Sequence, residues 1–100
     1  MKPRILGFEP GIMVFMPSDQ AGRPIATGQP IYMTYDEYEA FRLTYNQGLK
    51  QEEVAKRMGV SRGTVWRCIE SARKKVALML AERRALVVTP RPPQAEEGGT

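Results

Sequence analysis

Apolar residues in the middle of the chain recur at intervals of three and four, which is the spacing of one face of a helix. The first such segment begins at Thr34, and its aromatic residues share a face that is expected to be core: Tyr38, Phe41 and Tyr45. Thr34 and Glu37 have the spacing of a capping box. The run Asn46-Gln47-Gly48 is predicted to end this helix, with Gly48 as a left-handed cap.

Two further helices are expected, one over about Gln51–Met58 and one from Arg62 to Arg84. At 1.5 Å per residue the last would be about 34 Å long, which is more than a three-helix domain can cover. Its distal apolar positions are Val76, Met79 and Leu80. These side chains need a cover, which either the N-terminal strand or a partner chain supplies.

Two apolar runs outside the helices predict short strands. Ile12–Met16 fits a buried strand, and Ala85–Thr89 fits a second one. Ile5–Phe8 is expected to be a shorter extended piece, followed by a turn at 9–11. We therefore divide the chain into an extended or β N-terminal segment (1–33), a helix-turn-helix domain (34–84), a short strand (85–89) and a disordered tail (90–100) rich in proline, glutamate and glycine.

The stretch Gln51–Glu70 has the residue pattern of a DNA-reading helix-turn-helix, in which two helices cross steeply around a tight turn. Ala55 gives the small contact in the first helix, and Gly59 gives a turn position that tolerates positive φ. Ser61 is placed to cap the N–H of Thr64, so the recognition helix should start at residue 62. The expected fold class is mainly α, a three-helix helix-turn-helix with a long third helix and short N- and C-terminal β-strands.

Charge is distributed unevenly along the chain, whose formal net charge is +4. From Ser61 to Arg91 there are eight cations and two anions, whereas the other residues carry seven cations and nine anions. Positive charge gathered on a recognition helix and its extension is the electrostatic footprint of a phosphate binder. The alternative interpretation is an ordinary solvated helix surface.

Composition argues against an enzyme, a metal site or a bound cofactor. The chain has no histidine and a single cysteine, which excludes Cys/His zinc sites and triads built on an imidazole base. Cys68 is expected to be a small core residue rather than a nucleophile. No apolar run approaches the roughly 20 residues of a membrane span, and the first residues lack a secretory pattern. We therefore expect a cytoplasmic protein with no membrane partner.

Three motifs stand out along the helical part: DEYEAFRL (36–43), GLKQEEVAKRMGVSRGTVWRCIESARKKVA (48–77) and a final ALVV. With them the chain resembles a family of short prokaryotic proteins, a domain of unknown function predicted to bind DNA, over roughly residues 30 to 90. The helices are also similar to region 4 of bacterial sigma factors, which shares the acidic helix start, the Gly-Leu corner and the Ser-Arg-x-Thr-Val recognition helix. The resemblance implies DNA binding and transcriptional regulation.

The outward face of the recognition helix is the predicted reading surface. If Val65, Cys68, Ile69 and Ala72 face the core, the residues that face outward near the helix start are Arg62, Gly63, Trp66, Arg67 and Glu70. Arg62 and Arg67 are candidates for bidentate contact with guanine, although Arg62 could instead pair with Glu53. Glu70 either accepts from cytosine or, as we favour, pairs with Arg73 or Lys74 on its own helix.

Three features complete the predicted site. Trp66 stands where the family has a smaller or polar residue, and the sequence leaves open whether it is exposed to DNA or buried against the N-terminal segment. Gly63 would allow close approach of the backbone. Phosphate contacts are expected from Lys50, Ser61, Thr64, Arg73 and Lys74. Lys50 occupies the position where Ser, Thr or Asp would cap the second helix, so either the cap is missing or Lys50 meets a phosphate.

The sequence therefore predicts a sequence-specific double-stranded DNA-binding protein, a transcriptional regulator that reads the major groove. The alternative is a sigma-like protein-interaction module that docks on RNA polymerase or a partner factor. A homodimer is expected, because a partner chain would cover the distal apolar stripe and pair the two strands.

Overall fold

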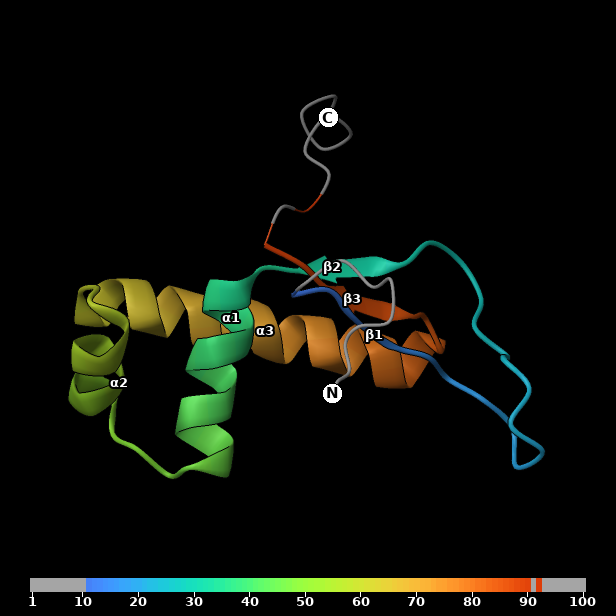
Figure 1. Cartoon of the computed structure of the whole chain (residues 1–100), viewed down its shortest axis with the longest axis horizontal. Coiled ribbons are helices and arrows are strands. Elements are labelled where there is room, and N and C mark those ends of the chain that lie inside the picture. The colour runs from blue at the N-terminus through green and yellow to red at the C-terminus, as the bar shows by residue number, and fades with distance from the viewer. Residues whose placement is uncertain (1–10, 91, 93–100) are drawn as a thin grey trace, which may run out of the picture.

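The computed structural model describes residues 11–90 and residue 92. Three α-helices and a π-helical segment lie between and around three short strands. In chain order the elements are β1 (Met13–Phe15), β2 (Ile31–Met33), α1 (Tyr35–Phe41), η2 (Arg42–Asn46), α2 (Gln51–Met58), α3 (Arg62–Glu82) and β3 (Leu86–Val88). Helix α3 runs the length of the fold, with α1 and α2 against its N-terminal half and the sheet against its C-terminal half (Figure 1). The mainly α fold is as predicted.

The start of α1 is the predicted capping box. The hydroxyl of Thr34 accepts from the N–H of Glu37 at 3.1 Å, and the Glu37 carboxylate accepts from the N–H of Thr34 at 2.8 Å. After Phe41 the helix continues as the π-helical turn η2. Gly48 then adopts a left-handed conformation, with φ of 74°, and the N–H of Leu49 donates to the carbonyl of Leu43 at 3.1 Å. The predicted end of the helix is thus confirmed.

The helical core is built by small and aliphatic side chains, and none of the three aromatic residues expected in the core is fully buried. The buried cluster consists of Ala40, Leu43, Val54, Ala55, Val65 and Ile69. Tyr45 is 54% exposed, and only Tyr38 and Phe41 are partly buried. The expectation for Tyr45 was wrong, because the extra residue in a π turn changes which side chains face inward after it.

The three strands form one sheet in the order β1-β3-β2, with β1 antiparallel and β2 parallel to β3. The three helices form the crossover that parallel pairing of β2 and β3 requires. A second buried cluster joins the sheet to α3: Ile31, Met33, Ala72, Leu86 and Val88. The strand β2 was expected only as extended chain leading into the first helix.

Two predictions about the β segments need correction. The strand expected at Ile12–Met16 spans Met13–Phe15. It is not buried, because α3 packs mainly against β2 and β3, and Val14 and Phe15 are exposed. The strand expected at 85–89 spans only Leu86–Val88. The predictions for Ile5–Phe8, for most of the turn at 9–11 and for nearly all of the tail lie outside the described residues.

The long helix ends two residues earlier than predicted. It stops at Glu82, because Arg83 adopts a left-handed conformation with φ of 53° and turns the chain toward β3. Thr27 holds this corner: its hydroxyl donates to the carbonyl of Glu82 at 2.9 Å, and its N–H donates to the carbonyl of Arg83 at 2.8 Å. None of the described helices combines the length and the apolar character needed to cross a membrane.

The chain's own sheet covers part of the distal stripe on α3. Val76 and Met79 pack against the sheet cluster, as does Met13 from β1. Leu80 remains 72% exposed. The sheet, mainly through β2 and β3, therefore covers two of the three stripe residues, and the third is left on the surface.

Candidate nucleic-acid interface

The turn between α2 and α3 has the geometry that its residues predict. Gly59 caps α2 in a left-handed conformation with φ of 70°, and its N–H points to the carbonyls of Ala55 and Lys56. The N–H of Val60 donates to the carbonyl of Ala55 at 3.0 Å. Ala55 itself is buried in the helical core, so a small side chain lies at the contact between the helices.

The N-terminus of α3 is capped by Ser61, as the sequence indicated. The Ser61 hydroxyl accepts from the N–H of Thr64 at 3.1 Å and also donates to the Thr64 hydroxyl oxygen at 3.0 Å. The first N–H groups of any α-helix lack partners within the helix and carry a partial positive charge. Those of Arg62 and Gly63 lie at an exposed helix end, which is a favourable place for a phosphate.

The two faces of α3 are divided as predicted. Val65, Ile69 and Ala72 are buried, and Cys68 is partly buried beside them. On the other side the exposed residues at the helix start are Arg62, Gly63, Trp66 and Arg67. Trp66 is 54% exposed, which decides between the two alternatives for this residue in favour of the surface.

The two arginines on this face, Arg62 and Arg67, have different hydrogen-bond partners. Arg67 donates from Nη2 to the hydroxyl of Thr64 at 3.2 Å, one turn back along the helix. Arg62 makes no ion pair with Glu53, whose carboxylate accepts instead from the N–H of Lys50 at a long 3.4 Å. Within the described chain no carboxylate neutralises either guanidinium.

Further along α3, two of the cations are paired and one is free to meet an anion. Glu70 accepts from Arg73 Nη1 at 3.1 Å, which is the pairing expected from their spacing. Lys75 binds Glu37 at 2.8 Å and faces α1. Lys74 is exposed and has no ion pair among residues 11–90.

Lys50 begins α2 without a capping acceptor. It has the extended backbone of an N-cap residue, with φ of −77° and ψ of 158°, but its side chain makes no capping hydrogen bond. An ammonium group has no lone pair to offer the helix N–H groups. Helix α2 therefore lacks a side-chain N-cap at Lys50, and the exposed Lys50 ammonium is available to a phosphate.

Sequence reasoning left out two exposed cations near the turn, Lys56 and Arg57. Lys56 is exposed in the last turn of α2, three residues before Gly59. A basic residue at a helix C-terminus complements the helix dipole, which is why it drew no attention. Its position beside the turn adds a cation on the side of α2 that leads into the recognition helix.

The described residues hold no group of three or more His, Cys, Asp or Glu side chains that could bind a metal ion. Burial, with smaller contributions from the Asp36 and Glu37 carboxylates, raises the pKa of the Cys68 thiol. A raised pKa keeps the sulfur protonated at neutral pH and makes it a poor nucleophile. The exposed guanidinium groups of Arg62 and Arg67 are the groups on this surface that can contact an anion.

Comparison with known proteins gives the family of this chain. A family described as "Protein of unknown function DUF134" matches residues 1–91. The chain belongs to this family. The match also includes the N-terminal thirty residues, which the motif resemblance had left out.

Relatives in this family carry the name UPF0251 protein. One from Pyrococcus abyssi is 54% identical over 88 residues, which are 87% of this chain and 77% of the relative. One from Methanosarcina acetivorans is 37% identical over 86 residues, covering 86% of this chain and 74% of its own. One from Moorella thermoacetica is 41% identical over 85 residues, covering 85% and 55%. No solved structure matches the chain.

Proposed function

We propose that this protein is a sequence-specific double-stranded DNA-binding transcriptional regulator that reads the major groove with a helix-turn-helix similar to sigma region 4. The observation that carries the proposal is the start of α3, where Arg62, Trp66 and Arg67 are exposed together while Val65 and Ile69 anchor the opposite face in the core. In helix-turn-helix proteins this end of the second helix contacts the base edges.

Each exposed side chain has a stated role in the proposal. Arg62 and Arg67 donate to guanine O6 and N7, the commonest base-specific protein–DNA contact. Trp66 packs on a thymine methyl group or a sugar. Gly63, which carries no side chain, lets the helix end approach the groove floor.

The remaining residues position the helix on the backbone. Ser61 and Thr64 lie beside the exposed N–H groups of the helix start, where a phosphate would be bound. Lys50, Arg73 and Lys74 add point charges, with Glu70 orienting the Arg73 guanidinium through their 3.1 Å ion pair. Such contacts fix the register on DNA without reading its sequence.

A salt titration tests the proposal directly. If Lys50, Arg73, Lys74 and the two reading arginines meet DNA, the logarithm of the affinity for a random duplex should fall with the logarithm of salt with a slope of about −3 to −5 per monomer. A slope near zero would remove the basis for DNA binding.

The alternative, a sigma-like module that docks on RNA polymerase or a partner factor, is favoured by one observation. The described surface carries a group of exposed apolar side chains on β1 and at the end of α3. A docking module of this kind would show little salt-sensitive affinity for DNA and would bind purified RNA polymerase in the same titration format.

A further inference from the structure

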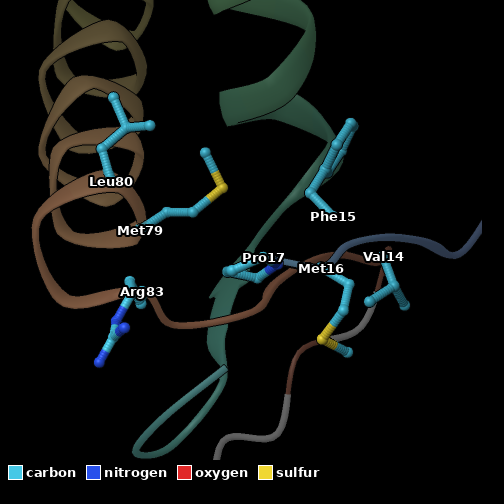
Figure 2. A pocket seen from close by; sticks show the side chains of 7 residues that line it. All are labelled: Val14, Phe15, Met16, Pro17, Met79, Leu80 and Arg83. Carbon is cyan, nitrogen blue, oxygen red and sulfur yellow. The ribbon is translucent and has the colours of Figure 1, made fainter. Parts of the chain in front are cut away.

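We propose that a second copy of this chain binds the surface formed by β1 and the C-terminal end of α3, which we name the distal surface. Its side chains surround a groove of about 430 Å³ lined by Val14, Phe15, Met16, Pro17, Met79, Leu80 and Arg83. Figure 2 shows the strand residues on one side of this groove and Met79 and Leu80 on the other. The groove lies away from the helix-turn-helix.

The area of the distal surface suits a stable protein interface. Val14, Phe15, Met16 and Leu80 are exposed by 53%, 44%, 46% and 72%. At 150–250 Å² for a fully exposed large side chain, they present about 400 Å² of apolar surface. Patches of roughly 300–600 Å² are often functional, and a standard interface buries about 800 Å² per partner. Four residues thus supply about half of one side.

The shape and chemistry of the distal surface favour a copy of itself over another partner. Leu80 projects from the helix beside the groove, so a two-fold axis would place each Leu80 against the groove of the other protomer. The edge strand β1 can pair antiparallel with its own copy, since its other neighbour in the sheet is β3.

Charge does not oppose this pairing. Among the residues that the structure describes, Arg83 is the one charged residue that lines the groove, and its guanidinium extends away from the apolar side chains (Figure 2). Two copies can therefore meet through Phe15, Met16 and Leu80 without burying like charges. Apart from Arg83, the described lining residues offer no charge to an acidic or basic partner.

The distal surface leaves the reading face free, a consequence that rests on the proposed function. Leu80 is eighteen residues after Arg62 on α3, which is about 27 Å along the helix axis. A dimer joined at this end presents two recognition helices at its far ends. Half-sites would be spaced by one or two DNA turns, about 34 or 68 Å.

Sedimentation equilibrium of the full chain from micromolar to millimolar concentration tests the proposal. The protein should approach twice its mass of 11.3 kDa, and Leu80→Glu should raise the dimer dissociation constant at least tenfold. Leu78→Glu is the matched control. Leu78 is also exposed and lies two residues from Leu80, so it is on a different face of α3. It should leave the dissociation constant within a factor of two or three.

Met16→Glu changes the same surface next to β1 and should raise the dimer dissociation constant as Leu80→Glu does. The helical circular dichroism of both variants should be unchanged. A wild-type chain that stays at 11.3 kDa throughout, or a dimer that neither substitution weakens, overturns the proposal. DNA binding is judged separately: Leu80→Glu should retain the salt-dependent binding of a monomer, whereas Arg67→Ala should remain dimeric. Failure of either proposal can thus be told from failure of the other.

Discussion

Replacing Glu37 by glutamine should destabilise the protein more than any other single change of a surface charge. Glu37 joins the start of α1 to the middle of α3. Its carboxylate accepts from the N–H of Thr34 at 2.8 Å and from Lys75 at 2.8 and 3.0 Å, and it also accepts from the hydroxyl of Ser71. The side chains of Glu37 and Lys75 are only 13% and 26% exposed.

The expected loss lies between that of a surface and a buried ion pair. Breaking a buried pair costs about 3–5 kcal/mol, and an exposed pair contributes about 0–1 kcal/mol. Glutamine keeps one oxygen that can accept from the N–H of Thr34, but it loses the charge and the second acceptor oxygen. We therefore expect about 2 kcal/mol for Glu37→Gln, within the range of hydrogen bonds to charged groups. For a domain of this size that lowers Tm by roughly 8–16 °C.

The pH dependence gives an independent check. Burial raises the pKa of Glu37, but the hydrogen bonds from Lys75, Ser71 and Thr34 outweigh it and leave the pKa below its usual 4.5. A carboxyl whose folded pKa is lowered stabilises the fold fully above its unfolded pKa. That contribution should be lost as the pH falls below 4.5 through the folded value, and Glu37→Gln should flatten this part of the profile.

Urea unfolding of a double-mutant cycle measures the pair itself. Glu37→Gln, Lys75→Met and their combination should give a coupling free energy of about 1–2 kcal/mol. The control cycle uses Glu39 and Arg42, which also form an ion pair, at 2.7 Å, but are 41% and 37% exposed. Its coupling should be below about 0.5 kcal/mol. Equal coupling in the two cycles would refute the argument from burial.

Four further substitutions test the proposed DNA contacts. Gly63→Ala should stabilise the helix by roughly 0.5–1 kcal/mol, because the added Cβ meets only ordinary contacts at 3.8 and 3.9 Å. The same substitution should weaken DNA binding in a gel-shift titration. An unchanged affinity would show that the DNA groove does not approach Gly63. Lys50→Ser should add about 0.5–2 kcal/mol of capping to the unfolding free energy and reduce the salt slope, and a variant altered in neither respect contradicts both roles. Arg67→Ala should cost roughly 1–3 kcal/mol of binding free energy on the preferred site and relax sequence specificity, whereas Lys74→Ala should weaken binding to all DNA sequences alike. If Arg67→Ala lost the same affinity for specific and random DNA, Arg67 would not read a base.

The helix-turn-helix could be predicted from sequence because its signals are local. The Thr34 capping box, the left-handed Gly59 and the Ser61 cap each depend on residues within four positions of one another. The division of α3 into a buried and an exposed face likewise follows from its 3.6-residue period. Local rules of this kind place Arg62, Gly63 and Arg67 correctly on the surface, but they do not decide the exposure of Trp66, and Glu70 is half-buried.

The parts that sequence reasoning missed depend on distant partners. The strand β2 has three residues, and its partner β3 follows all three helices in the sequence. Because the two strands are so far apart along the chain, no local sequence pattern predicts their pairing. Val14 and Phe15 are exposed because α3 packs mainly against β2 and β3, which only the assembled fold decides. The π turn that carries Tyr45 outward has no residue signature comparable to a glycine cap.

Helix α3 is long enough to take part in both the helical core and the sheet core. Its first half supplies Val65 and Ile69 to the helical core, and its second half supplies Ala72 to the sheet core, with Val76 and Met79 packed beside it. The ion pair between Glu37 and Lys75 joins α1 to the second half of α3, and the hydrogen bond from Ser71 to Glu37 joins α1 to the middle of the helix. A helix held in two cores is a rigid rod, so a partner bound at Leu80 would set the direction of the Arg67 end without any flexible linker. If both proposals hold, the spacing of DNA half-sites is therefore determined by the length and crossing angle of two α3 helices, and inserting a helical turn between the cores would change the spacing while leaving the bases read at each half-site the same.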